Sequence, residues 1–113
     1  MSAPVPIHSE AARRWHTLRL TEQFAHVGSE VERAIRAHEA GNARRFDGAL
    51  ARALELFALT AADERWRGLR RREICRAREE FCRIFFDPDV SSDSASGLRR
   101  YFLAFAAAAR RSA

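Results

Sequence analysis

Apolar residues recur every three or four positions along most of this chain, and no segment alternates apolar and polar residues with period two. The first spacing is typical of amphipathic helices and the second of half-buried strands, so the pattern predicts an all-α fold. The first long helix is expected over about 21–40, with Trp15 and Leu18 as a backward extension, and Gly41 and Asn42 provide its stop. Its apolar stripe consists of Leu20, Phe24, Val27, Val31, Ala34 and Ile35.

The second and third helices follow with short links. We expect the second over about 43–62 and the third, without a break, over about 64–86. Asp63 is a good N-cap for the third helix, and Pro88 closes it off. The core stripe of the third helix is Trp66, Ile74, Ala77, Phe81, Ile84 and Phe85.

The last helix is expected over about 97–111, after the Ser- and Asp-rich loop 87–96. Ser94 or Ser96 provides its cap. Because the first two links are short, they can join only antiparallel neighbours. The economical architecture is therefore an antiparallel up-and-down four-helix bundle.

Composition places the chain among globular proteins of one domain. Its 113 residues are 47% hydrophobic and 31% charged, too apolar for a disordered chain and too charged for a membrane-spanning one. We expect residues 1–12, which contain Pro4 and Pro6, to be a flexible arm, and residues 13–113 to be a single helical-bundle domain. The longest apolar run, 101–109, is far shorter than the roughly 20 residues that span a bilayer.

The two cysteines indicate the compartment. Cys75 and Cys82 lie seven positions apart in the third predicted helix, which separates their backbones by roughly 10 Å and prevents a disulfide between them. Free thiols and the lack of a secretory leader favour a cytoplasmic protein.

All 20 basic residues are arginine, and the net charge is +5. The absence of lysine is typical of a biased genomic base composition, but its chemical consequence is independent of that origin. Each guanidinium group can bind a carboxylate or a phosphate with two hydrogen bonds. The partners that this charge allows are an acidic protein or a nucleic acid.

The third predicted helix is the most basic segment. Four of its arginines project within about 40° of one another on an ideal helix and form a ridge. These are Arg65, Arg72, Arg76 and Arg83. Such a ridge can bind an acidic partner or follow a phosphate backbone. The alternative is an ordinary solvated face, because Glu73, Glu79 and Glu80 interleave with the arginines and can pair with them.

Arg70 projects into the apolar arc of the same helix. A charge in that position needs a partner, and Glu30, Glu32 or Glu55 would provide a buried Arg–Glu pair between helices. In the alternative interpretation Arg70 binds an anion in a cleft between helices.

The third helix also carries surplus apolar residues. Cys75, Cys82 and Phe86 project away from its main stripe, and Leu103 lies off the stripe of the last helix. Exposed apolar patches usually mark interfaces, so this surplus favours a homo-oligomer or another partner. An irregular bundle that buries both sides of a helix is the alternative.

His38 falls in the apolar stripe of the first helix, five positions after Arg33. This R-x4-H spacing resembles the motif of the HEPN family, four-helix bundles that include metal-independent ribonucleases. The resemblance implies that Arg33 and His38 are a catalytic pair near a scissile phosphate, or that the chain is the accessory subunit of a nucleotidyltransferase. The alternative is a core or capping histidine near a helix C-terminus.

Three blocks, 21–34, 46–63 and 101–110, together resemble a small family of bacterial and archaeal helical proteins without an assigned activity. The middle block also resembles one tetratricopeptide helix pair, although a single pair cannot form the groove of such adaptors.

No other chemical motif is present. The histidines and cysteines lack metal-binding spacing, and no glycine-rich loop precedes a lysine, so we expect neither a metal nor another cofactor. The sequence therefore predicts a non-catalytic helical interaction module that binds itself or an acidic partner through its third and fourth helices. The alternative is an RNA-binding protein or ribonuclease of HEPN type, or a nucleotidyltransferase accessory subunit.

Overall fold

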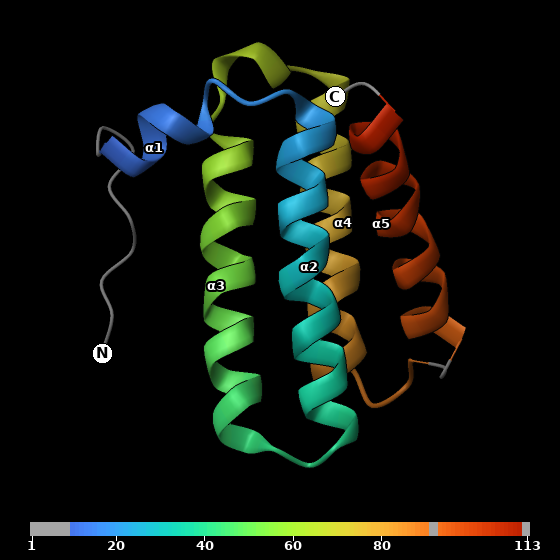
Figure 1. The fold of residues 1–113 in the computed structure, drawn as a ribbon. Helices are drawn as coiled ribbons and strands as arrows, with labels where there is room; N and C mark the ends of the chain where they lie inside the picture. The colour runs from blue at the N-terminus through green and yellow to red at the C-terminus, as the bar shows by residue number, and fades with distance from the viewer. Residues whose placement is uncertain (1–9, 91–92, 112–113) are drawn as a thin grey trace.

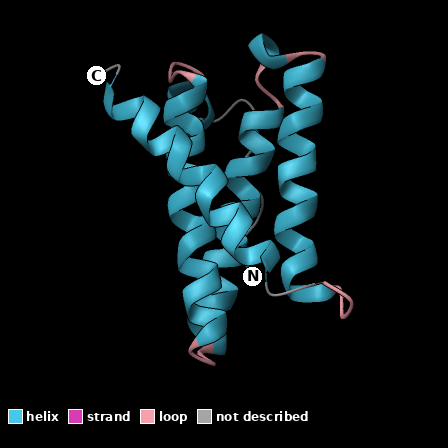
Figure 2. Ribbon diagram, turned by 90° about the vertical axis from the view of Figure 1, so that its right-hand side faces the viewer, coloured by secondary structure: helices cyan, strands magenta, loops and turns pink. Residues whose placement is uncertain are grey.

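Helices are the only regular structure in residues 10–90 and 93–111, which are the residues that the computed structural model describes (Figures 1 and 2). The elements in chain order are α1 (Glu10–Trp15), α2 (Leu20–Glu39), α3 (Ala43–Ala61), the 3₁₀ helix η1 (Glu64–Trp66), α4 (Leu69–Phe86) and α5 (Asp93–Arg111).

The four long helices form the predicted antiparallel bundle. In Figure 1, α2 and α4 run downward, and α3 and α5 run upward. Each helix packs against two neighbours, in the order α2, α3, α4, α5 and back to α2. The prediction of an all-α up-and-down four-helix arrangement is therefore confirmed.

The link between α2 and α3 reverses the chain as predicted. Gly41 adopts a φ of +68°, a conformation that glycine tolerates and most residues avoid. The N–H of Gly41 donates to the carbonyl of His38, and the N–H of Asn42 donates to that of Ala37, which is the Schellman pattern. The Asn42 side chain then accepts a hydrogen bond from the N–H of Arg45 and caps α3.

The prediction of an unbroken third helix over 64–86 is wrong. Asp63 caps a short turn of 3₁₀ helix as the N-cap prediction required, but the chain then becomes extended at Arg67. Gly68 follows with φ 80° and ψ −129°, a combination open only to glycine. The helix therefore restarts at Leu69, and the residues before the break do not share its rotational phase.

The two ends of the chain also differ from expectation. Most of the expected arm, residues 1–9, lies outside the described residues, and Glu10–Trp15 forms α1, which packs on α3 and buries Ala12. Helix α5 begins at Asp93, four residues earlier than predicted, because an acidic residue suits the first turn of a helix and outweighs the loop-like composition. Ser94 and Ser96 consequently lie inside the helix.

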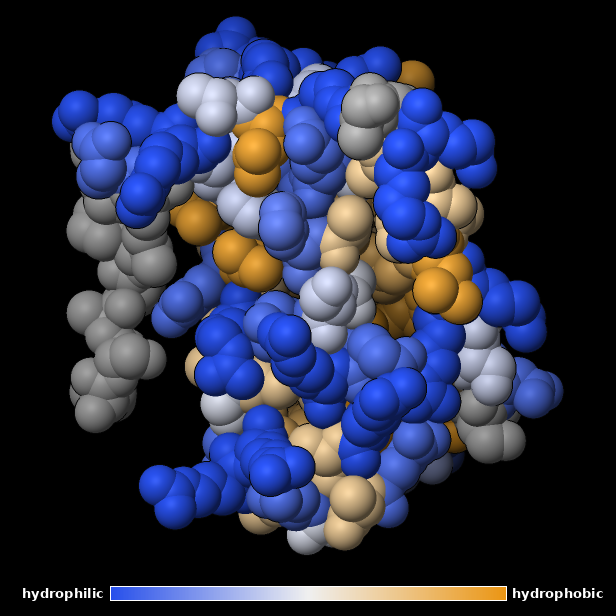
Figure 3. Space-filling model, viewed as in Figure 1, coloured by the Kyte–Doolittle hydropathy of each residue, from blue (hydrophilic) through white to orange (hydrophobic). Residues whose placement is uncertain are grey.

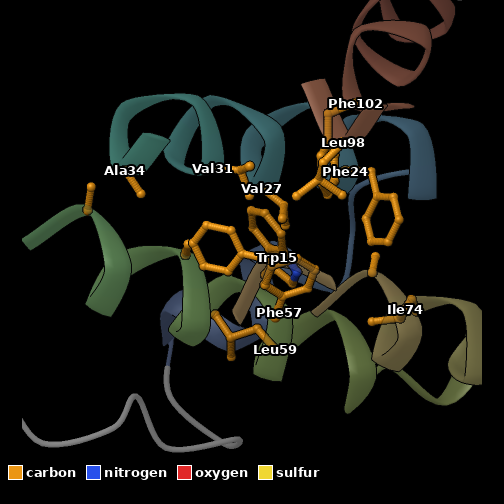
Figure 4. Close-up of a cluster of buried hydrophobic side chains, with 14 of the residues drawn as sticks. Trp15, Phe24, Val27, Val31, Ala34, Phe57, Leu59, Ile74, Leu98 and Phe102 are labelled. Atoms are coloured by element: carbon orange, nitrogen blue, oxygen red, sulfur yellow. The ribbon is translucent and has the colours of Figure 1, made fainter. Parts of the chain in front are cut away.

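Aromatic side chains from all four long helices fill the core (Figure 4). Phe24 of α2 has ring contacts with Phe57 of α3 and Phe102 of α5, and Phe57 in turn contacts Phe81 of α4. Gly28 allows α2 and α5 to approach closely, because a Cβ at this position would lie 2.8 Å from the Cβ of Phe102. The bundle is thus tightly packed where α2 meets α5.

Candidate functional site

Arg65, the first residue of the predicted ridge, belongs to η1, and its guanidinium group is already engaged in hydrogen bonds within the protein. Its guanidinium nitrogens donate to both carboxylate oxygens of Asp63, at 2.6 to 3.2 Å, and to the carbonyl of Leu18 at 2.6 Å. Burial by itself raises the pKa of the Asp63 carboxyl, but the hydrogen bonds from Arg65 and Gln23 outweigh it and lower this pKa to about 2. Arg65 and Asp63 therefore form a charged pair at one end of the bundle.

A buried polar network surrounds this pair. Gln23 is fully buried, and its amide donates to Asp63 and to the carbonyl of Trp15. The amide oxygen of Gln23 accepts the indole N–H of Trp66, and the indole N–H of Trp15 donates to Thr60. This network was not predicted from the sequence, in which the only signal was a glutamine beside the apolar stripe of the first helix.

Arg70 is exposed, so the predicted buried Arg–Glu pair is wrong. The prediction projected Arg70 and Trp66 on one continuous helix, and the break at Gly68 invalidates that projection. The guanidinium carbon of Arg70 lies 5.4 Å from the centre of the Trp66 ring, a cation–π contact. Arg70 and Arg65 line a surface hollow of about 520 Å³ between α2, α4 and α5.

The other predicted ridge residues lie along α4. Arg72 and Arg76 are exposed and form no ion pair with any residue of the described chain. Arg83 pairs with Glu80 at 3.1 Å and with Asp87 at 3.4 Å. Among the four ridge residues, Arg72 and Arg76 are therefore the two that combine exposure with the absence of an ion-pair partner in the described ranges.

Those two arginines, with Cys75, line a hollow of about 480 Å³ on the outer side of α4. Cys75 is an exposed free thiol, whereas Cys82 is half-buried. Two large apolar side chains stand at the ends of the same helix, Leu69 with 79% of its surface exposed and Phe86 with 65%. The outer side of α4 thus combines basic and apolar groups with one exposed carboxylate, Glu79, which lines the same hollow.

A second hollow, of about 410 Å³, separates α4 from α5. The hydroxyl of Tyr101 donates to a carboxylate oxygen of Glu73 at 2.7 Å across it. Burial, together with this hydrogen bond, raises the pKa of the Tyr101 phenol above its usual range. The phenol therefore stays protonated and links the two helices.

The structure does not place Arg33 and His38 at one site. Arg33 is exposed and pairs with Glu30. His38 is exposed rather than buried in the core stripe, and its ring packs against Phe46 and Phe85, with centres 5.4 and 5.0 Å away. Because five positions on a helix correspond to a rotation of about 140°, the two side chains leave α2 in different directions.

Arg33 instead belongs to a cluster that was not predicted from the sequence, which we call the arginine hollow. It is a depression of about 850 Å³ between α2 and α3, and its lining contains Arg33, Arg36, Arg44, Arg45 and Arg52 without any acidic residue. Figure 3 shows strongly hydrophilic side chains over the lower part of the face that α2 and α3 form. The cluster spans two helices, so only their relative register, which the sequence does not state, brings it together.

In the described ranges, no group of three or more His, Cys, Asp or Glu side chains is placed to hold a metal ion. None of the helices described here has the length and apolarity needed to cross a membrane. This chain matches no protein-family model, no curated protein and no solved structure.

Proposed function

We propose that this protein is a non-catalytic binding module that docks an acidic segment of a partner protein on the outer side of α4. The observation that carries the proposal is the pair Arg72 and Arg76, which are exposed near apolar groups and form no ion pair within the described residues. Guanidinium groups without ion-pair partners near exposed apolar side chains are suited to a protein interface, where arginine is enriched.

Charge favours an acidic partner over a second copy of this chain. The hollow on this side is lined by three arginines and one glutamate, Arg71, Arg72, Arg76 and Glu79, so two copies of this side would both be positive and would repel each other. The exposed Leu69 favours a protein over a nucleic acid at this surface, because a protein partner can bury this aliphatic side chain, whereas a phosphate backbone cannot. We also propose that the protein is cytoplasmic, because its two free thiols remain reduced in that compartment.

Cross-linking from Cys75 tests this proposal, because its exposed thiol lies in the same hollow as Arg72 and Arg76. The purified Cys82→Ser variant is first labelled at Cys75 with a cross-linker that has one thiol-reactive end, and it is then added to cell extract. Captured peptides are identified by mass spectrometry. We expect acidic segments of one protein, and at least a tenfold loss of capture in Arg72→Glu/Arg76→Glu.

The matched control is Arg110→Glu/Arg111→Glu, which changes the net charge equally at the exposed end of α5. Equal loss in the control would show general electrostatic attraction and contradict the proposal. Capture of this chain itself, with a dimer in light scattering, would replace the acidic partner with self-association.

A second candidate function is the one that the HEPN resemblance implies, RNA binding or cleavage, or service as a nucleotidyltransferase accessory subunit. Arg33 and His38 are both exposed and so are accessible to RNA, but within one copy of the chain they face different directions, so the ribonuclease requires RNA that contacts both sides of α2. The test is cleavage of single-stranded RNA by the wild type and by His38→Ala. If cleavage survives this substitution, or if the wild type does not cleave RNA, the ribonuclease hypothesis is excluded.

A further inference from the structure

The arginine hollow concentrates positive charge in a small concave volume. Five arginines line about 850 Å³, and the other lining residues are small or uncharged, Ala37, Ala40, Asn42, Gly48 and Ala49. Because these residues are small, they do not fill the hollow, and the guanidinium group of Arg52 lies against the α3 backbone at Gly48. A ligand can therefore enter the hollow and approach several guanidinium groups at once.

Two glutamates beside the hollow hold three of these arginines without using all their donors. Glu30 is almost fully buried and accepts hydrogen bonds from Arg33 and Arg52, each through one nitrogen. Glu32 accepts from the Nε of Arg36. Each arginine side chain is more than half exposed and keeps further N–H groups for an external acceptor.

The remaining two arginines carry the excess charge. Arg44 and Arg45 are exposed and form no ion pair within the described residues. The two glutamates offset at most two of the five charges, so the hollow keeps a net positive charge. An arrangement of this kind attracts a multiply charged anion.

We propose that the arginine hollow binds a ligand with several adjacent phosphate groups, either a nucleoside triphosphate or the backbone of a single-stranded nucleic acid. Adjacent phosphates concentrate more negative charge and more acceptor oxygens than carboxylates on a peptide, and the guanidinium fork matches their geometry. No aromatic residue lines the hollow, so the ligand is held by its phosphates and not by stacking of its bases. This site is separate from the outer side of α4 and goes beyond the protein interaction proposed above.

The test is calorimetric titration of the full chain with four probes: inorganic tripolyphosphate, ATP, a ten-nucleotide oligouridylate and a ten-residue polyglutamate. We expect binding of at least one phosphate probe, weakening with salt. The substitution Arg44→Gln/Arg45→Gln should weaken it at least tenfold. These two arginines can be removed without leaving a buried glutamate unpaired, and circular dichroism checks that the variant folds.

Arg110→Gln/Arg111→Gln is the matched control, because it removes the same two charges at the opposite end of the bundle (Figure 1). Retained affinity in this control supports the site, and equal loss in both variants overturns it. Tighter binding of ATP than of the oligouridylate identifies a nucleotide ligand, and tighter binding of the oligouridylate identifies a nucleic acid. Tripolyphosphate shows how much of the affinity the phosphate groups alone provide.

Equal affinity for polyglutamate, or no binding of any phosphate probe at about 1 mM, overturns the proposal. The substitution Arg72→Glu/Arg76→Glu should leave phosphate binding intact, so failure of this proposal and failure of the α4 interface are distinguishable.

Discussion

Helices α2 and α4 have similar lengths but differ in burial and in charge. Of its 20 residues α2 buries eight, whereas α4 buries only three of its 18, which are Ile74, Ala77 and Phe81. Helix α2 contains two arginines and α4 contains six. Packing free energy is therefore concentrated in α2 and its neighbours, whereas α4 leaves most of its surface accessible to solvent.

Truncating one phenylalanine on each helix tests this contrast most strongly. Phe24→Ala on α2 should lower the free energy of unfolding by about 3 to 5 kcal/mol, because the side chain is 1% exposed and its removal leaves a cavity. Phe86→Ala on α4 should change it by less than about 0.5 kcal/mol. Urea denaturation followed by circular dichroism measures both, and equal losses would abolish the contrast.

Removing the charge of Asp63 tests how the segment before α4 is held to α2. The amide introduced by Asp63→Asn cannot keep the charge-assisted bonds from Arg65, so stability at pH 7 should fall by about 2 kcal/mol. Because the folded pKa of about 2 lies below the ordinary 3.8, ionisation of Asp63 stabilises the fold fully above about pH 4. This contribution is lost as the pH falls from about 4 towards 2.

The readout is the difference in unfolding free energy between wild type and Asp63→Asn at each pH, since the other carboxylates titrate in both proteins. The difference should shrink to nearly zero as the pH approaches the folded pKa of about 2. A difference independent of pH would mean that Asp63 contributes by its shape alone.

A pair of glycine substitutions examines the close packing around α2. Gly28→Ala should cost about 1 to 2 kcal/mol, because the new Cβ would collide with Phe102 and force α5 outward. Gly48→Ala on α3 meets only the flexible end of Arg52, 3.3 Å away, and should stabilise by less than about 1 kcal/mol through helix propensity. Thermal unfolding gives both signs, and a stabilising Gly28→Ala would show that α5 is not tightly packed.

The smallest effect concerns surface ion pairs of α2. Arg99 of α5 pairs with Glu32 at 2.9 Å and with Glu39 at 3.0 Å, and these hydrogen bonds raise the pKa of Arg99. Arg99→Gln should lower stability by about 0.5 to 1 kcal/mol in dilute buffer and by less in about 1 M salt, where the pairs are screened. Arg72→Gln, which removes no ion pair described for α4, should have no measurable effect on unfolding.

Periodicity was sufficient to predict the fold because its signal repeats many times. The α2 stripe of Phe24, Val27, Val31 and Ile35 is buried as expected, and the Gly41 turn ends the helix where predicted. The break in the third predicted helix at Gly68 was not predictable in this way, because it depends on the backbone conformation of one residue. Gly68 is one residue among helix formers, and only its φ of +80° shows that the chain breaks there.

The candidate sites were less predictable because they depend on the rotational phase of each helix and on the register of one helix against the next. The expected ridge combined Arg65 with residues of α4 across the break, and the structure assigns Arg65 to a pair with Asp63. The arginine hollow joins residues of α2 to residues of α3 that lie up to 19 positions away in the sequence. A projection of one helix at a time cannot reveal such a cluster, since it requires the two helices to be placed side by side.

The buried network around Gln23 has a spectroscopic consequence. The chain contains two tryptophans, and both indole N–H groups donate to buried side chains at the same end of the bundle, that of Trp66 to Gln23 and that of Trp15 to Thr60. Tryptophan fluorescence therefore reports on this end alone, whereas far-ultraviolet ellipticity reports on all the helices. If the two transitions separate during unfolding, with fluorescence changing first, this end of the molecule opens before the rest.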